Sequence, residues 1–148
     1  MKYFLIAGEA SGDLHGGNLM ASIQEADKEA RFRFLGGDIM ARTAGEPLVH
    51  YREMAFMGFV NVLRNLASIR NFLHLAQSQI EDWRPDVVIL IDYPGFNLKV
   101  AEFCYQTGVP VYYYISPKIW AWKEYRIKKM KRYIQELFVI FPFEVDYF

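Results

Sequence analysis

The sequence contains one cysteine, six prolines and no long run of apolar residues. A single cysteine cannot form an intramolecular disulfide, which excludes a disulfide-stapled fold and suits a reducing cytoplasm. No stretch reaches the roughly 18 apolar residues that a membrane-spanning helix needs. The apolar run after Met1 ends at Glu9, too early for the core of an export signal. We therefore expect neither export by that route nor a transmembrane segment.

Net charge is also lacking, because 17 Lys and Arg balance 17 Asp and Glu among the 148 residues. Overall charge therefore points to neither nucleic acid nor membrane. The hydrophobic content of 53% indicates a globular chain, and no repeat or linker divides it. We expect one domain over residues 1–148. The chain stops at Phe148 without a polar tail, which predicts that further chain belongs after it.

The most informative stretch is DVVILIDYPGF, which runs from Asp86 to Phe96. Five apolar residues, Val87 to Ile91, predict a strand buried on both faces of a parallel sheet. Asp92 would stand at its carboxyl end, where open α/β sheets place their ligand crevice. An Asp before Pro-Gly either caps the following loop or works as an acid or base, and position alone leaves both interpretations open.

Strand and helix patterns alternate along the chain, which predicts a three-layer α/β/α fold with a doubly wound, mostly parallel sheet. The expected strands cover residues 3–7, 31–35, 48–51, 87–91, 109–115 and 137–141. The first expected helix is capped by Ser11 or Asp13 and runs to about Glu29. The others cover residues 38–44, 56–83 and 96–107, with a further one in the basic segment 123–132.

The first strand is followed by the glycine-rich segment GEASGDLHGGNLM. Gly16 and Gly17 would allow the helix to approach the sheet closely. A nucleotide-binding oxidoreductase with NAD or flavin is one alternative, but the spacing is not G-x-G-x-x-G, and Glu9 and Asp13 would repel a pyrophosphate. The three His and the single Cys show no metal-ligand spacing, so no metal or cofactor is expected.

The predicted helix over residues 56–83 has more apolar side chains than one docking face needs. Its core stripe would be Val62, Leu66, Ile69, Leu73, Ala76 and Ile80. The surplus residues are Met57, Phe59, Val60, Leu63, Phe72 and Leu75. They would either meet lipid or a partner protein, or pack under the preceding loop.

Two further segments lie near the end of the chain. SPKIWAW places Trp120 and Trp122 after a predicted strand, where they would either stack on a sugar or pack in the core or between domains. KEYRIKKMKR carries six cations on a predicted helix whose apolar side is Ile127 and Met130. These cations either attract an anionic bilayer or form a solvated face.

Taken in order, AGEASGDLHGGNLM, MGFVNVL, PDVVILIDYPGFNL, YYISPKIWAW and FPFE resemble the lipid-A-disaccharide synthase family over nearly the whole chain. The resemblance implies the Rossmann-like amino-terminal, acceptor-side domain of a GT-B glycosyltransferase, whose carboxyl-terminal UDP-sugar domain is absent here. The implied reaction transfers 2,3-diacylglucosamine from its UDP donor to the 6-hydroxyl of 2,3-diacylglucosamine 1-phosphate, with inversion. The isolated chain is expected to be inactive.

The resemblance also implies roles for residues. Asp92 would be the general base that deprotonates the acceptor hydroxyl. The family pattern IDxPDFN has a second Asp where this chain has Gly95, so Asp92 is the only acid in that loop. The residues implied to line the acceptor side are Gly8, Glu9, Ser11, Gly12, Asp13, Asn97, Ser116, Trp120 and Trp122.

Because the implied acceptor carries acyl chains and a phosphate, the apolar and basic surfaces would both serve to contact it or the membrane. The implied membrane or acyl-chain contacts are Met57, Phe59, Val60, Leu63, Phe72, Leu75, Lys128, Lys129 and Arg132. The expected partners are the two lipid-linked sugars, the missing domain and the cytoplasmic face of the inner membrane, without nucleic acid. A non-enzymatic membrane-associated module and a sibling transferase acting on another lipid-linked sugar remain alternatives.

Overall fold

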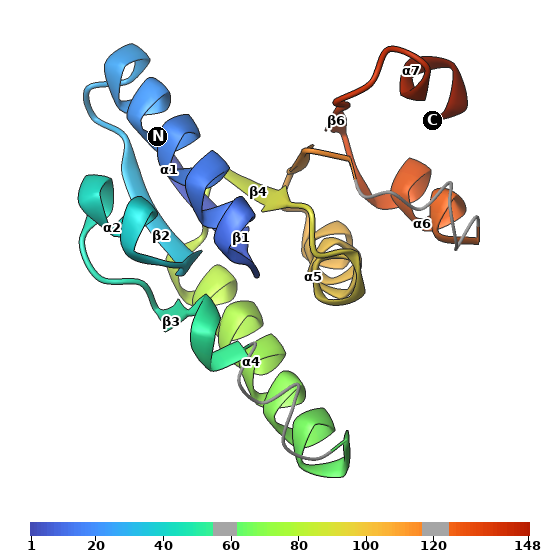
Figure 1. Cartoon of the computed structure of the whole chain (residues 1–148), viewed down its shortest axis with the longest axis horizontal. Coiled ribbons are helices and arrows are strands. Elements are labelled where there is room, and N and C mark those ends of the chain that lie inside the picture. Colours follow the sequence, from blue (N-terminus) through green and yellow to red (C-terminus); the bar gives the residue numbers. More distant parts are fainter. Residues whose placement is uncertain (55–61, 117–124) are drawn as a thin grey trace.

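The protein folds around a six-stranded parallel sheet with the order β3-β2-β1-β4-β5-β6 (Figure 1). The computed structural model describes residues 1–54, 62–116 and 125–148, without the side chains of 62–65 and 147. The strands are β1 (Lys2–Ala7), β2 (Arg31–Gly36), β3 (Val49–His50), β4 (Val87–Ile91), β5 (Val111–Tyr114) and β6 (Glu136–Phe138). The helices are α1 (Ala10–Ala26), α2 (Asp38–Ala44), α4 (Val62–Trp83), α5 (Pro94–Thr107), α6 (Tyr125–Tyr133) and α7 (Glu144–Tyr147).

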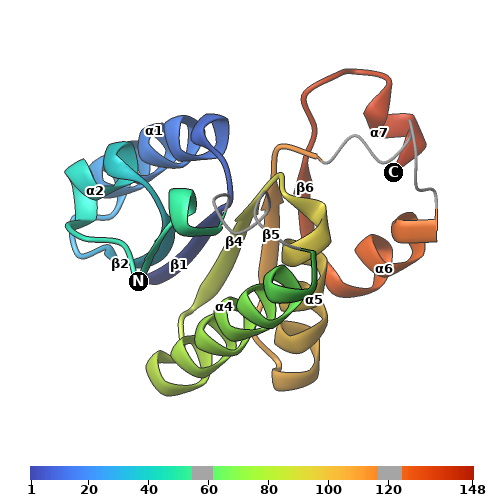
Figure 2. The same cartoon turned by 60° about the horizontal axis from the view of Figure 1, so that its bottom comes forward.

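The chain winds outward twice from the middle of the sheet. It passes from β1 to β3 in one direction, returns through α4 to β4, and continues to β6 in the other direction. Because parallel crossovers are right-handed, the two halves place their helices on opposite faces. Helices α1 and α2 lie on one face, and α4 and α5 lie on the other (Figure 2). The predicted doubly wound, three-layer architecture is confirmed.

Strand β4 is the central element, as its unbroken apolar sequence predicted. All five residues of Val87–Ile91 are buried, and the strand pairs with β1 on one side and β5 on the other. Because both faces of this strand are buried, apolar and polar residues do not alternate along it, which explains the continuous VVILI run.

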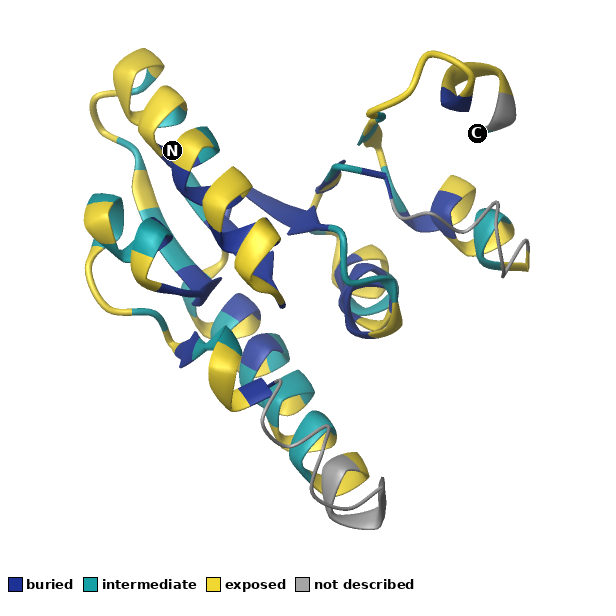
Figure 3. Cartoon of the chain, viewed as in Figure 1, coloured by how far each residue is buried: buried dark blue, intermediate teal, exposed yellow. Residues whose placement is uncertain are grey.

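The two faces of the sheet hold separate hydrophobic clusters, and the dark blue buried segments of Figure 3 follow the central strands. The cluster under α4, α5 and α6 is the larger, and it includes Ile80, Val100 and Met130. The cluster under α1 and α2 is smaller and includes Met20 and Met40. Cys104 is fully buried in the larger cluster, and its burial raises the pKa of its thiol to about 12.

Helix α1 begins earlier and ends sooner than predicted. Its N-cap residue is Glu9, which makes no side-chain capping hydrogen bond, and the helix ends at Ala26 rather than near Glu29. The prediction that Ser11 or Asp13 caps this helix was wrong, because both residues lie within its first turns. The predicted close approach to the sheet is confirmed at Gly16, where an added Cβ would lie 3.0 Å from Ile91 Cδ1 of β4. Gly17 instead packs against α2, because an added Cβ there would lie 2.7 Å from Ile39 Cγ2.

Helix α4 buries most of its predicted stripe and a neighbouring sector as well. Ala76 and Ile80 are buried, and Ile69 and Leu73 pack against the larger cluster, as expected. Leu66 is 60% exposed on the amino-terminal part of α4, which extends beyond the sheet (Figure 1). Phe72 and Leu75 are partly buried against the larger cluster, so the prediction that they are surplus to the core was wrong. The physical reason is that the helix buries a wider apolar sector than a single row of residues.

The remaining boundaries agree with the sequence patterns to within a few residues. Helix α2 has its predicted ends, and Gly45 follows it with φ of 81°. Helix α5 ends at Thr107, and Gly108 caps it in the left-handed conformation. Strand β3 is at the edge of the sheet, as predicted. Strands β5 and β6 are shorter than the apolar runs that predicted them.

Candidate functional site

The carboxyl ends of three neighbouring strands bring together residues that lie far apart in the sequence. Ala7 at the end of β1 pairs with Ile91 at the end of β4, and Ile91 pairs with Tyr114 at the end of β5. The next residues along each strand, Gly8, Asp92 and Ile115, therefore lie at the same edge of the sheet. The strand order reverses between β1 and β4, which is where open α/β sheets bind ligands. We define this edge as the switch-point edge.

The backbone at the switch-point edge adopts unusual conformations. Four non-glycine residues of the described chain have positive φ, and three of them, Asp92 (43°), Tyr93 (47°) and Ile115 (68°), follow β4 or β5 directly. Left-handed backbone costs about 1–2 kcal/mol per residue in non-glycine residues. Strain of this kind concentrates at functional sites, where surrounding contacts hold it in place. The strained residues therefore independently mark the edge that the topology indicates.

Asp92 is half-buried, and its backbone carbonyl is held by two hydrogen bonds. The side-chain amide of Asn97 donates to Asp92 O at 2.8 Å and to Ile91 O at 3.3 Å. The hydroxyl of Tyr113 also donates to Asp92 O. Asp92 lies two residues before Pro94, the first residue of α5, and the amino end of a helix carries partial positive charge that favours an anionic neighbour. A partly accessible carboxylate in this position can accept a proton from a bound hydroxyl.

Two tyrosines that the sequence analysis did not single out belong to this edge. Burial, followed by the negative charge of Asp92, raises the pKa of Tyr113 well above its ordinary value. Burial and then the charge of Glu9 raise the pKa of Tyr93. Both phenols therefore stay protonated at neutral pH. The alternation of VYYY in β5 could have indicated Tyr113, because it shares the face of buried Val111.

The predicted acceptor-side residues of the glycine loop have different environments. Glu9 and Ser11 are exposed, whereas Gly8 and Gly12 are buried. A Cβ at Gly8 would lie 2.4 Å from the ring of Tyr93, so this glycine allows the ring to cover the end of β1. The loop therefore presents Glu9 and Ser11 to solvent beside a covered glycine backbone.

Asp13 does not line an open surface, which corrects the prediction for this residue. Its side chain is 3% exposed. Its Oδ1 accepts hydrogen bonds from Gly37 N at 2.8 Å and Met40 N at 3.1 Å, and its Oδ2 accepts one from Ile39 N at 3.0 Å. These amides belong to the first turn of α2 and have no partner within that helix. Asp13 thus caps α2 from the neighbouring helix.

Asn97 and Ser116 are buried as well, with 0% and 2% exposure, so neither lines an open surface. Asn97 Oδ1 and Ser116 Oγ are buried without a hydrogen-bond partner. The amide of Asn97 instead supports the backbone at the end of β4. Trp120 and Trp122 lie outside the described residues. So do Met57, Phe59 and Val60, and the side chain of Leu63.

The three predicted membrane-facing cations are exposed on α6, and its apolar residues Ile127 and Met130 pack against the larger cluster. Two of the cations also contact protein groups. Lys129 Nζ lies 3.4 Å from a carboxylate oxygen of Glu102, and the guanidinium of Arg132 lies 5.4 Å from the ring centroid of Tyr105. The predicted solvent-facing basic surface is therefore partly engaged with α5.

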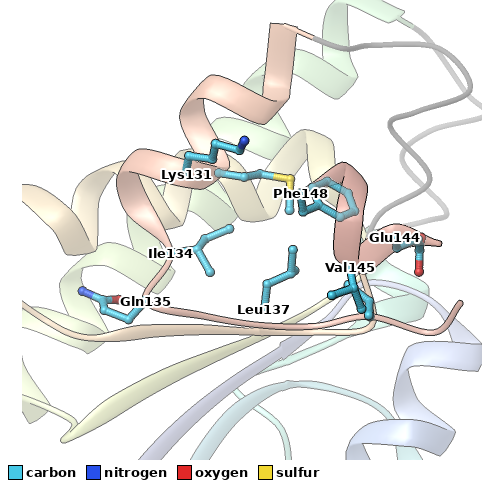
Figure 4. Close-up of a pocket in the computed structure, with 9 residues that line it drawn as sticks. Lys131, Ile134, Gln135, Leu137, Glu144, Val145 and Phe148 are labelled. Atoms are coloured by element: carbon cyan, nitrogen blue, oxygen red, sulfur yellow. The ribbon is translucent and has the colours of Figure 1, made fainter. Parts of the chain in front are cut away.

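Two cavities contain none of the predicted site residues. One of about 290 Å³ lies between α6, β6 and α7, where Ile134, Leu137, Val145 and Phe148 face a common space (Figure 4). Another of about 440 Å³ lies beside α1 over the face of β4 and β5 that includes Val87 and Tyr112. Both are mainly apolar in their lining and lack the convergent titratable groups of a catalytic site.

The described part of the chain contains no group of three or more His, Cys, Asp or Glu arranged to hold a metal ion. Among the same residues, no helix is both long and apolar enough to cross a membrane.

The sequence matches known proteins over nearly its whole length. Residues 3–148 match the family described as "Lipid-A-disaccharide synthetase". The chain is 45% identical to the lipid-A-disaccharide synthase of Trichlorobacter lovleyi over 99% of its length, covering 38% of that protein. It is 43% identical to the protein of that name from Acidobacterium capsulatum over 98% of its length, covering 36% of that protein. The chain thus spans less than two fifths of the curated relatives it matches.

Solved structures with the same fold have little sequence identity. A UDP-GlcNAc 2-epimerase from Neisseria meningitidis, bound to UDP-GlcNAc, superimposes with a TM-score of 0.63 at 11% identity over 94% of this chain and 40% of that chain. A putative UDP-N-acetylglucosamine 2-epimerase from Listeria monocytogenes gives 0.65 at 8% identity, over 93% and 38%. These similarities confirm the predicted Rossmann-like fold class of GT-B type.

Proposed function

Because this chain belongs to the lipid-A-disaccharide synthetase family, we propose that it is the acceptor-side domain of an inverting glycosyltransferase of lipid A biosynthesis. The reaction joins 2,3-diacylglucosamine, delivered as its UDP derivative, to the 6-hydroxyl of 2,3-diacylglucosamine 1-phosphate. Its products are the β-1,6-linked disaccharide 1-phosphate and UDP. The observation that carries this proposal is the half-buried Asp92 at the switch-point edge of a Rossmann-like sheet.

Inversion of configuration at the donor carbon determines which catalytic group this domain must supply. A single in-line displacement at an α-linked donor carbon gives a β-glycoside, so the acceptor oxygen attacks from the face opposite the diphosphate. That oxygen must lose its proton as the new bond forms, and Asp92 is the proposed general base. General-base catalysis of this kind contributes roughly 10²- to 10⁴-fold to a rate.

The remainder of the longer protein is proposed to hold the donor. Relatives are more than twice the length of this chain, and GT-B enzymes place two Rossmann-like domains across one cleft. Cationic side chains and helix amino termini from that second domain would stabilise the leaving diphosphate. The 148-residue chain alone should therefore form no disaccharide.

The test is disaccharide formation from radiolabelled donor in three preparations. The complete enzyme should be active, the isolated chain inactive, and the complete Asp92→Asn variant slower by about 10²- to 10⁴-fold. Asp82→Asn, which changes an exposed carboxylate on α4, is the matched control and should leave the rate unchanged. Full activity in Asp92→Asn would remove the general base from the proposal, and disaccharide formed by the isolated chain would remove the need for a second domain.

Peripheral association with the cytoplasmic face of the inner membrane is a second part of the proposal. Its support is the exposed basic side of α6, where each cation near an anionic surface contributes about 1 kcal/mol. The double variant Lys128→Glu and Arg132→Glu should reduce sedimentation of the chain with phosphatidylglycerol vesicles. Lys28→Glu with Arg31→Glu makes the same charge change near the start of β2. Equal losses in the two double variants would contradict a specific role for α6.

A further inference from the structure

The carboxylate at the end of β4 depends on a backbone conformation that its own sequence does not favour. Asp92 and Tyr93 are consecutive left-handed residues, with φ of 43° and 47°, and neither is a glycine. An isolated Asp-Tyr pair would leave this conformation for the extended or right-handed regions. Other parts of the molecule must therefore hold it.

The holding contacts converge on one atom, the carbonyl oxygen of Asp92. Tyr113 donates its hydroxyl to this oxygen from β5, and Asn97 donates its side-chain amide from α5 at 2.8 Å. The same Asn97 nitrogen lies 3.3 Å from Ile91 O, so it spans the last residue of β4 and the first residue beyond it. Because this carbonyl belongs to the peptide between Asp92 and Tyr93, fixing it fixes the torsions on both sides.

Both donors are rigidly placed. Tyr113 and Asn97 are each 0% exposed. The ring of Tyr113 lies in the larger hydrophobic cluster, and Asn97 is in the first turn of α5, beyond Pro94 at the start of that helix. A tyrosine fixed in the core and an amide fixed on a helix can hold a carbonyl to within about 0.5 Å, more precisely than residues on loops do.

We propose that Tyr113 and Asn97 are positioning residues that clamp the Asp92 carbonyl and thereby direct the Asp92 carboxylate toward the acceptor hydroxyl. This inference rests on the proposed function, because it gives Asp92 the role of general base. Neither clamp residue touches the substrate. Their contribution is geometric, and a displacement of about 1 Å at a reacting group can cost about 10²-fold in rate.

The first test uses the 148-residue chain and requires no activity. Tyr113→Phe removes one oxygen atom and keeps the ring. In isotope-labelled protein, the NMR shifts of the Asp92 carbonyl carbon and the Tyr93 amide should move in this variant. They should stay unchanged in Tyr112→Phe, which alters the preceding residue, on the opposite face of β5. Unchanged shifts in Tyr113→Phe would overturn the clamp whatever the enzyme's function.

The second test measures turnover in the complete enzyme. Tyr113→Phe and Asn97→Ala should each lower kcat by about 10- to 100-fold and leave the acceptor KM within about twofold. In an Asp92→Asn background, single-turnover rates should show no further loss from Tyr113→Phe, because the carboxylate that the clamp positions is gone.

The outcomes separate the two proposals. If Tyr113→Phe is equally harmful with and without the Asp92 carboxylate, or raises KM alone, the clamp does not act through Asp92. If Asp92→Asn itself keeps full activity, the general-base assignment fails, and the NMR result still decides whether Tyr113 holds the backbone. Asn97→Ala provides an independent second variant should Tyr113→Phe fold poorly.

Discussion

Two carboxylates follow the two central strands of this protein, and they have opposite environments. Asp13, shortly after β1, is buried, and both of its carboxylate oxygens accept hydrogen bonds from backbone amides at the amino end of α2. Asp92, directly after β4, is half-buried, and its backbone rather than its carboxylate receives the clamp contacts. A carboxylate that accepts three backbone amide hydrogen bonds has a structural role, whereas the contacts at Asp92 position the main chain that carries its carboxylate.

The same contrast extends to the two halves of the sheet. In the half built by β1, α1, β2 and α2, an atom lies within 3 Å of where a Cβ would be at Gly8, Gly16, Gly17, Gly36 and Gly37, although Gly45 after α2 has none within 4 Å. In the half built by β4, α5 and β5, Gly95 and Gly108 have nothing within 4 Å. The first half is therefore expected to tolerate substitution less well. Four predictions test this difference, from the largest effect to the smallest.

The largest effect is expected at Asp13. Asp13→Ala removes the acceptor of three backbone amides at the amino end of α2 and should lower the free energy of unfolding by at least about 3 kcal/mol, since one hydrogen bond to a charged group contributes about 1.5–3 kcal/mol. Urea unfolding at pH 7 measures it. Glu25→Ala on the exposed side of α1 is the control and should change stability by less than about 0.5 kcal/mol. If Asp92→Asn were as destabilising as Asp13→Ala, the contrast between the two carboxylates would be lost.

The second prediction concerns the contact between α1 and α2. In Gly17→Ala, the new Cβ would lie 2.7 Å from Ile39 Cγ2, 3.1 Å from Ile39 C and 3.2 Å from Ile39 O. Backbone atoms cannot move aside as a side-chain tip can, so we expect a loss of about 2 kcal/mol. Thermal and urea unfolding both report it. An unchanged stability in Gly17→Ala would mean that α2 can move away from α1 without cost, and would contradict the tight packing of the first half.

The third prediction uses Cys104 in the second half. Its pKa in the folded protein, about 12, is raised from an ordinary value of 9.0 by burial. The unfolded chain therefore loses the thiol proton first, so stability is complete below about pH 9 and falls as pH rises toward 12. At pH 10 the loss from this thiol should be about 1.4 kcal/mol.

The control for this pH effect is a variant that lacks the titrating thiol. Cys104→Ala should be less stable at pH 7, because it leaves a small cavity, but its stability should fall less steeply between pH 8.5 and 10. Chemical unfolding at a series of pH values separates the two effects. Parallel curves for the two proteins would show that the Cys104 thiol contributes nothing to alkaline unfolding.

The smallest effects are expected at the two open glycines of α5, which form a matched pair. Gly108 caps the helix with φ of 74°, and Gly95 is within its first turn. Gly108→Ala should cost about 1 kcal/mol, because alanine resists left-handed backbone. Gly95→Ala should gain about 0.5 kcal/mol, since it restricts the unfolded chain. Thermal unfolding distinguishes the two variants. Equal changes in their melting temperatures would show that the backbone conformation of these glycines does not determine how well a substitution is tolerated.

Much of the fold was predictable because its signals are local. The VVILI run of β4 identified the central strand, and Gly45 and Gly108 marked helix ends through their backbone freedom. The predictions failed where a residue serves a distant element. Asp13 was predicted to cap its own helix but caps α2, and Phe72 and Leu75 were predicted to be surplus but pack on the core.

The sequence by itself determined the α/β class, the place of Asp92 at a strand end, and the family, because apolar runs, turn residues and motif spacing are properties of short segments. Only the tertiary structure decided which side chains reach Asp92. Tyr113 and Asn97 meet its carbonyl because parallel pairing sets β5 beside β4 in a fixed register. A register between strands 20 residues apart is set by packing across the whole sheet, and no local pattern encodes it.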